Sequence, residues 1–490
     1  MRAPAAEEGQ VTDVAVIGAG LGGLAAAVSL AAAGRSVEVF EASERPGGKA
    51  DEVILDGVAC DTGPTLLTLP HVAETLFSLG GTALRDEVSL LQHAPATRYR
   101  FADGLSLDVH HQLEDTLSSV ERALGAEAAS QLGRHLERAR RIWEASADPF
   151  VFGAAPSLRG VLALGPRAWW SLGRIDAHRT LAQVIRADVE DPHLRDLLMR
   201  YATYNGSDPR RAPGTLACIA WVELGLGGWG VEGGVHALAT ALARVAERLG
   251  VVLHLGEPVE AIALSDDVVT GLTVGGRQVR ARAVVANADV AHVHRLLPAR
   301  GRGGVRPQGT LSTSGWVGIL RVGPGERVAH EVVFPAEYGQ EFADLFDRCR
   351  PPADPAVYTC ALSRAHGRGR WGDGEPLFAM VNAPAGTPAG HQLAEVALGK
   401  LVAAGLVGEG DELLWERDPA GLAQRFPDTH GALYGAASSD LMAAFRRPAN
   451  RVRGLRGLYL AGGSAHPGGG VPLVLQSGMQ AAAELLAESR

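Results

Sequence analysis

Three glycines near the start of the chain have the spacing of a nucleotide-binding turn. Gly18, Gly20 and Gly23 form the pattern GxGxxG directly after a short apolar run. The first glycine allows a tight turn, the second lets the backbone approach a pyrophosphate, and the third permits close packing of strand against helix. Glu41 follows 21 residues after Gly20, where a carboxylate can bind an adenosine ribose and would repel a 2′-phosphate. The pattern predicts a dinucleotide site that disfavours NADP.

The next glycine-rich segment extends this motif. In ERPGGK, which covers residues 44–49, two basic side chains and a close backbone turn are placed to meet phosphates: Arg45, Gly48 and Lys49. The segment DTGPTLLTLP then supplies a rigid turn suited to passing beneath a flavin: Gly63, Pro64 and Thr65. Both segments resemble the extended motif of flavoproteins with two dinucleotide folds, and they favour FAD over NAD.

The elements that must position these residues come from separate parts of the chain. A buried strand over 14–17, a helix over 21–33 and a second strand over 36–40 predict a βαβ unit. Strand patterns return after residue 251, with a break at 256–258, a hairpin around 275–276 and a strand ending near Asn287. An amphipathic helix over 233–250 precedes them. The nucleotide domain is therefore predicted to be discontinuous.

We accordingly predict an α/β fold with a discontinuous Rossmann-type FAD-binding domain, a β-sheet substrate domain and a helical lobe. The FAD-binding domain is assigned to three ranges, 10–90, 226–300 and 441–490. The helical lobe is assigned to 91–225 and the substrate domain to 301–440. Within the lobe, the apolar stretch 150–175 carries Trp169 and Trp170. It reads either as a buried helix pair or as a patch that contacts a membrane surface.

Composition narrows the classes of partner. The net charge of −9 and the lack of a Lys/Arg run argue against nucleic acid. The four cysteines are scattered without a CxxC pair, which argues against a disulfide framework or a metal site. The opening residues do not resemble a secretory signal, and no apolar run has the 18 residues of a membrane span. We expect a cytoplasmic protein that rests peripherally on the cytoplasmic membrane.

Five further segments carry a family resemblance. They are RYATYNGSDPRRAP (200–213), GWGVEGGVHALATALA (228–243), FPDTHGALYG (426–435), AGGSAHPGGGVP (461–472) and the segment DTGPTLLTL already quoted. Together with the opening fingerprint they resemble the bacterial, phytoene-desaturase-like carotenoid desaturases. Within that group the chain most resembles the 1-hydroxycarotenoid 3,4-desaturases, also called hydroxyneurosporene or methoxyneurosporene dehydrogenases.

The resemblance implies non-covalently bound FAD, a long acyclic carotenoid substrate and action at a membrane surface. It assigns cofactor contacts to Gly18, Gly20, Gly23, Glu41, Arg45, Gly48 and Lys49, and to Val259 at the adenine and Asn287 at the strand end. Gly463 and Ser464 would approach the ribityl chain and pyrophosphate, and Val471 and Pro472 would line the isoalloxazine. Many relatives have an acid where Ser464 stands here.

The implied reaction transfers hydride from an allylic carbon to the flavin, and a neighbouring proton is lost. One or two polar groups in an apolar tunnel would recognise a 1-hydroxyl end group, since a site built to bond a hydroxyl rejects the analogue that lacks it. The sequence does not identify these groups. Candidates for polar roles near the flavin are Glu232, His466, Arg200 and Tyr201, each of which could instead be structural.

Several alternatives remain open. A phytoene-type desaturase or a carotenoid isomerase would use the same scaffold, and an isoprenoid-binding carrier could share it without catalysis. An amine oxidase is less favoured because only 5% of the residues are aromatic. The final electron acceptor, oxygen or a quinone, is not specified by the sequence.

Overall fold

The nucleotide-binding domain begins with a βαβ unit. The computed structural model describes residues 11–156, 175–307, 309–387, 390–438 and 446–488. The unit consists of β1 (Thr12–Ile17), α1 (Leu21–Ala32) and β2 (Val37–Glu41). Strands from far along the chain complete its parallel sheet: β10 (Val252–Leu255), β13 (Arg277–Ala286) and β19 (Leu458–Leu460). The sheet therefore draws on three separate stretches of chain.

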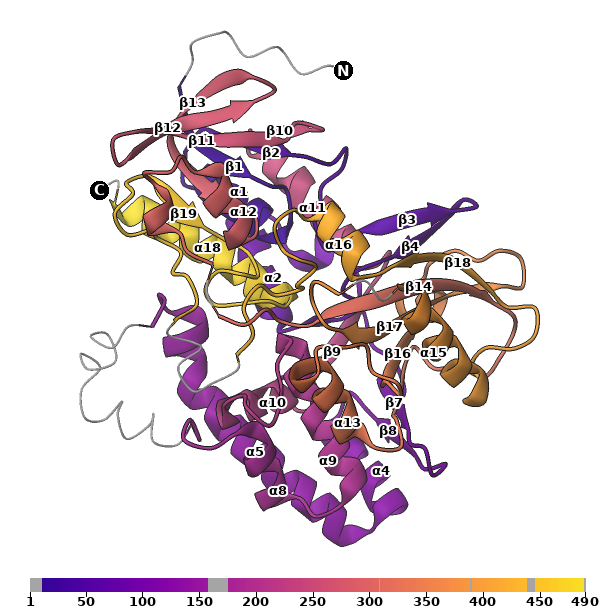
Figure 1. Cartoon of the computed structure of the whole chain (residues 1–490). Coiled ribbons are helices and arrows are strands. Elements are labelled where there is room, and N and C mark those ends of the chain that lie inside the picture. The colour runs from indigo at the N-terminus through magenta and orange to yellow at the C-terminus, as the bar shows by residue number, and fades with distance from the viewer. Residues whose placement is uncertain (1–10, 157–174, 308, 388–389, 439–445, 489–490) are drawn as a thin grey trace.

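Alternating residues of β1 build a core on each face of this sheet. Val14 and Val16 belong to the core beneath the helices, whereas Ala15 and Ile17 belong to the core on the opposite face. The helices of the first face are α1, α2 (Pro70–Leu79), α11 (Val235–Arg248) and α18 (Val471–Glu488), with α18 lying beside α1 (Figure 1). The other face is covered by β11 (Val259–Ser265), β12 (Val268–Val274) and α12 (Val290–Leu296).

A second sheet forms the floor of the substrate domain. Its strand order is β18-β14-β17-β16-β15-β7-β8. The strands are β7 (Thr97–Arg100), β8 (Ser106–Val109), β14 (Ser314–Val322), β15 (His330–Val333), β16 (Val357–Ala361), β17 (Glu375–Ala383) and β18 (Glu412–Arg417). Helix α15 (Gly390–Ala403) packs on one face. β7 and β8 fall inside the range 91–225 that was predicted as a helical lobe. They belong instead to this sheet, in which β7 pairs with β15 in parallel.

The helical lobe lies below the nucleotide domain and beside the second sheet (Figure 1). Its helices are α4 (Leu113–Leu124), α5 (Ala126–Ser146), α8 (Leu181–Asp188), α9 (Pro192–Met199) and α10 (Cys218–Leu224), with the 3₁₀ turns η2 (Arg200–Asn205) and η3 (Gly214–Ala217). They share one hydrophobic core with β7 and β15. Trp169 and Trp170, on which the membrane-patch interpretation depended, lie outside the described residues.

Short elements connect these bodies. They are β3 (Glu52–Leu55), β4 (Val58–Asp61), β5 (Leu67–Thr68), α3 (Leu84–Glu87), β6 (Leu90–Leu91), β9 (Gly228–Val231), α13 (Tyr338–Phe342), α14 (Leu362–His366) and α16 (Pro419–Arg425). Among the described residues, no helix is both long enough and apolar enough to cross a bilayer.

Candidate flavin-binding site

The opening glycine turn connects β1 to α1, and Glu41 organises its backbone. Gly18 has a φ of 89°, and its N–H donates to the Phe40 carbonyl at 2.8 Å. Oε2 of Glu41 accepts from the Ala19 N–H at 2.7 Å, and Oε1 accepts from the Ser43 N–H at 2.9 Å. Each carboxylate oxygen keeps a lone pair for a further donor, as a ribose hydroxyl requires.

Neighbouring atoms leave no room for side chains at these glycines. A Cβ on Gly23 would lie 2.0 Å from the Gly18 carbonyl oxygen. On Gly20 and Gly22 a Cβ would lie 2.9 and 2.5 Å from the side-chain amide of Asn287. Asn287 donates to the Gly18 carbonyl at 3.3 Å, so it packs against the turn from the end of β13. The close approach of backbone to helix start that a pyrophosphate needs is thus built into the fold.

The second glycine turn rests on the first. The Gly47 N–H donates to the Ala19 carbonyl at 2.9 Å, and a Cβ on Gly48 would lie 3.1 Å from the Gly20 Cα. Lys49 donates to the Leu433 carbonyl at 2.6 Å, and burial lowers the pKa of its ammonium.

Arg45, the other basic residue of this segment, turns elsewhere. Its guanidinium pairs with Asp51 at 3.0 Å and donates to the Glu52 carbonyl. The structure therefore places both basic side chains against protein groups, Lys49 on the 432–433 backbone and Arg45 on Asp51.

The closing glycine turn meets the opening one. A Cβ on Gly22 would lie 3.2 Å from the Gly462 N–H nitrogen, and one on Gly478 would lie 2.1 Å from the Gly22 carbonyl oxygen. The Ser464 hydroxyl accepts from the Val290 N–H at 3.0 Å, at the first turn of α12. The serine therefore satisfies the first N–H of α12, whose N-cap is Asp289, and it retains its own proton for donation.

The other predicted cofactor residues are distributed around these turns. Val259 starts β11, Pro64 lies in the loop before β5, Gly463 lies between Gly462 and Ser464, and Val471 and Pro472 form the first turn of α18. Their contacts with a cofactor stay predictions.

Three residues that no motif indicated hold the closing turn. Asn450 donates from Nδ2 to the carbonyls of Leu460 and His466 at 3.0 Å each. The Ser477 hydroxyl accepts from the Gly462 N–H at 3.1 Å. Arg447 donates to the Gly463 carbonyl at 2.7 Å, and burial lowers its pKa to about 10.

The turn containing Gly63 and Thr65 joins the glycine turns to the second sheet. A Cβ on Gly63 would lie 2.0 Å from the Lys49 carbonyl oxygen. The Thr65 hydroxyl lies 2.5 Å from the Tyr358 hydroxyl, which in turn lies 2.8 Å from Nδ1 of His330. Burial holds the pKa of His330 well below its usual range, so the ring is neutral.

The buried carboxylate of Asp61 stabilises the turn containing Thr65 through His366. Asp61 lies 3.1 Å from Nδ1 of His366 and accepts from Arg368 at 3.1 Å. Burial raises its pKa, but these two partners outweigh burial and the pKa is lowered. His366 also contacts the Thr65 carbonyl at 2.8 Å. The turn beneath the glycine site is therefore fixed by paired charges.

The four candidate polar residues are not brought to one place. Arg200 and Tyr201 lie in the helical lobe, where the Tyr201 hydroxyl donates to Glu223 at 3.2 Å. His466 follows the closing turn, but its Nε2 lies 3.0 Å from the Gly153 carbonyl. Burial lowers its pKa.

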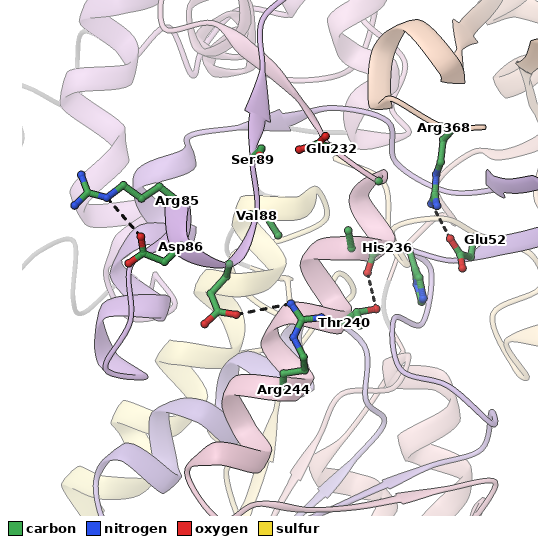
Figure 2. A pocket seen from close by; sticks show the side chains of 13 residues that line it. Glu52, Arg85, Asp86, Val88, Ser89, Glu232, His236, Thr240, Arg244 and Arg368 are labelled. Atoms are coloured by element: carbon green, nitrogen blue, oxygen red, sulfur yellow. Dashed lines mark hydrogen bonds and ion pairs between the residues drawn. The ribbon is translucent and has the colours of Figure 1, made fainter. Parts of the chain in front are cut away.

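Glu232 lines a separate cavity of about 480 Å³ (Figure 2). Figure 2 shows this carboxylate among charged side chains of both signs, including Glu52, Arg244 and Arg368. This wall is polar, unlike the dry surroundings that hydride transfer from a polyene requires.

These observations fit FAD better than any other group. The helix start offers backbone donors, the glycine turns pack backbone so closely that a Cβ would clash, and Glu41 offers acceptors to a ribose. Among the described residues no set of three or more His, Cys, Asp or Glu side chains is arranged to hold a metal ion.

Comparison with known proteins agrees with this site. The family model described as "flavin containing amine oxidoreductase" matches residues 21–313. The chain belongs to this family. It is an FAD-dependent oxidoreductase, and the predicted FAD cofactor and α/β fold are confirmed.

Curated relatives extend over nearly the whole chain. The chain is 36% identical to a hydroxyneurosporene desaturase of Rhodobacter capsulatus, over 97% of this chain and 98% of the relative. It is 34% identical to a hydroxyneurosporene desaturase of Rubrivivax gelatinosus, over 97% and 93%. A 1-hydroxycarotenoid 3,4-desaturase of a Flavobacterium is 30% identical, over 94% and 96%. These relatives confirm the predicted resemblance.

Solved structures agree on the fold. An oxidoreductase from Methanosarcina mazei superposes with a TM-score of 0.65 at 18% identity, covering 97% of this chain and 100% of that one. Cyclohexylamine oxidase from Brevibacterium oxydans gives a TM-score of 0.61 at 18% identity, covering 98% and 99%.

Proposed function

We propose that the protein is an FAD-dependent carotenoid desaturase that introduces the 3,4 double bond into an acyclic 1-hydroxycarotenoid. The observation that carries the proposal is the 36% identity to a hydroxyneurosporene desaturase over 97% of the chain. That similarity covers both glycine turns, which the structure brings into contact, and the substrate sheet beside them.

The chain's own contribution is to hold the cofactor, orient the polyene and exclude water. FAD bound at the glycine turns supplies a hydride acceptor. The Thr65 turn, held by Tyr358 and through His366 by Asp61, links this site to the substrate sheet. The lobe and the sheet share an apolar core, which suits the dry surroundings that hydride transfer needs.

Co-expression in a non-pigmented bacterial host tests the proposal. One strain makes a 1-hydroxylated acyclic carotenoid and a second makes phytoene, and the pigments are resolved by chromatography and absorption. We expect a product with one added double bond only from the hydroxylated substrate. Conversion of phytoene would instead indicate a phytoene-type desaturase, and geometric isomers without desaturation would indicate an isomerase. Flavin-free protein that binds pigment unchanged would indicate a carrier.

We also infer that the protein contacts a membrane surface from the cytoplasmic side, where such an apolar substrate dissolves. The expected result is co-sedimentation with phospholipid vesicles. Protein that stays in the supernatant at every lipid concentration would contradict it. Anaerobic assays with and without a quinone then separate the two proposed electron acceptors, oxygen and quinone.

A further inference from the structure

Arg200 is a half-buried cation where the helical lobe meets the substrate sheet. It begins η2, and its Nη1 donates to the Tyr204 hydroxyl at 2.8 Å. Its Cζ lies 5.1 Å from the Tyr204 ring centre and 5.6 Å from that of Tyr358. Within the part of the chain that the structure describes, no carboxylate oxygen lies within 4.0 Å of this guanidinium. The guanidinium therefore contacts the rings of Tyr204 and Tyr358 instead of the carboxylate that usually pairs with a buried arginine.

The buried carboxyl group of Glu223 acts on Arg200 electrostatically without forming an ion pair with it. Glu223 accepts from the Tyr201 hydroxyl at 3.2 Å, and burial raises its pKa toward the neutral form. A buried charge is costly unless hydrogen bonds satisfy it. Of the five guanidinium N–H donors, one is directed to Tyr204, and the Tyr99 hydroxyl also interacts with the group. Donors remain for another oxygen.

Arg200 is only half-buried. Tyr204 and Tyr358 beside it are half-buried too, so packed side chains do not close off the guanidinium. The Tyr358 hydroxyl is already engaged by Thr65 and His330, so its ring rather than its hydroxyl meets Arg200. The accessible guanidinium therefore lies beside two aromatic rings.

We propose that Arg200 donates a hydrogen bond to the hydroxyl oxygen of the substrate's end group and so determines specificity for hydroxylated carotenoids. This inference rests on the proposed function and names the group that recognises its substrate. Thr65 connects the position to the flavin side, because Thr65 bonds Tyr358 and the Tyr358 ring lies against Arg200. A guanidinium keeps its protons, so the role is binding and orientation, not proton transfer.

The test compares Arg200→Met with the wild-type holoenzyme on two purified substrates, a 1-hydroxylated acyclic carotenoid and its analogue without the hydroxyl. We expect KM for the hydroxylated substrate to rise roughly 10- to 100-fold, as for loss of a hydrogen bond to a charged group. Wild type should prefer the hydroxylated substrate, and this preference should shrink in Arg200→Met, because the analogue without a hydroxyl leaves the wild-type guanidinium unpaired. Binding is followed independently by the shift in carotenoid absorption on mixing with the protein.

Two variants guard against misfolding as an explanation. Tyr204→Phe removes the hydroxyl that holds Nη1, and we expect a smaller loss in the same direction. Arg186→Met, at an exposed site on α8, is the matched control and should change neither substrate. FAD content and the unfolding midpoint are measured for every variant.

Different results identify different failures. If wild type discriminates between the substrates and both Arg200→Met and Tyr204→Phe discriminate equally well, the assignment of Arg200 is wrong although the proposed function stands. An equal loss for both substrates would likewise overturn it in favour of a purely structural role. Failure of wild type to act on the hydroxylated substrate would overturn the proposed function itself.

Discussion

The flavin site of this protein is formed mainly by backbone atoms, whereas the substrate side is formed mainly by side chains. At the flavin site, backbone atoms approach so closely that a Cβ on Gly23 would sit 2.0 Å from a carbonyl oxygen. On the substrate side, side chains do the positioning: Tyr358 links Thr65 to His330, and Arg200 lies against its ring. A backbone site tolerates almost no added atom, whereas a side-chain site should be adjustable one hydrogen bond at a time.

The largest effect should come from adding one carbon to the opening turn. Gly23→Ala places a Cβ against backbone that cannot rotate away, and such overpacking costs about 3 kcal/mol, or at least about 100-fold in FAD binding. The ratio of flavin to protein absorbance after purification measures it. Gly399→Ala, on α15 with nothing within 4 Å of the new Cβ, is the control. If Gly23→Ala retained as much FAD as wild type, the conclusion that the flavin site tolerates almost no added atom would be wrong.

Removing a side chain that supports the backbone site should have an intermediate effect. Arg447→Met leaves the Gly463 carbonyl without its 2.7 Å donor, and we expect roughly 10-fold weaker FAD binding from one lost charge-assisted hydrogen bond. Fluorescence titration of apoprotein with FAD checks this. Arg453→Met changes an exposed arginine on the same segment and should leave the affinity as it is. Equal FAD affinities of the Arg447→Met and Arg453→Met variants would mean that the closing turn keeps its conformation without Arg447.

The substrate domain should also respond to pH in a way the glycine turns cannot. Glu341 is buried, which raises its pKa from 4.5 to about 7, against hydrogen bonds from Ala356 and Asn382 that lower it. The folded state therefore binds more protons than the unfolded state between these values. The free energy of unfolding should fall as pH rises from 4.5 to 7, by on the order of 2 kcal/mol.

Glu341→Gln should flatten this dependence. Urea unfolding at pH 5 and pH 7.5 measures the slope for wild type and variant, so that other titrating groups cancel. Glu337→Gln, at an exposed position next to the same helix, should keep the wild-type slope. A Glu341→Gln slope equal to that of wild type would show that this carboxyl group does not titrate in the range.

The smallest effect is expected at Ser464. Ser464→Ala removes the acceptor for the Val290 N–H, and the loss of such a helix-start bond costs about 1 kcal/mol. Ser464→Asp keeps an acceptor and should retain the stability. The unfolding midpoints of both variants are compared with that of wild type. An unchanged midpoint for Ser464→Ala would show that water replaces the serine hydroxyl without loss of stability.

The same difference explains what the sequence could predict. Close backbone approach permits only glycine, so Gly18, Gly20 and Gly23 were readable from spacing alone, and Glu41 followed from the length of the βαβ unit. Arg447 and Asn450 act on carbonyls of a turn more than ten residues away, and no spacing rule relates a side chain to a distant carbonyl.

The substrate side was less readable for a related reason. Tyr358 contacts Thr65, and His330 contacts Tyr358. These two residues are neighbours only because β15 pairs with β16, which requires knowledge of the sheet order. β7 and β8 were included in the helical range because strands of four residues carry too little periodicity to be distinguished. The proposed polar roles of Glu232 and His466 stay predictions, with Glu232 on a charged cavity and His466 against the Gly153 carbonyl.

The contact between Gly22 and Gly478 also has a consequence for biosynthesis. The opening turn must wait for a helix that the ribosome makes much later, because α18 packs on α1 at these glycines. A nascent chain that stops before residue 471 would carry a complete opening fingerprint and still lack the second half of its flavin pocket. Cofactor capture should therefore follow the synthesis of α18, and termination before that helix should yield colourless protein.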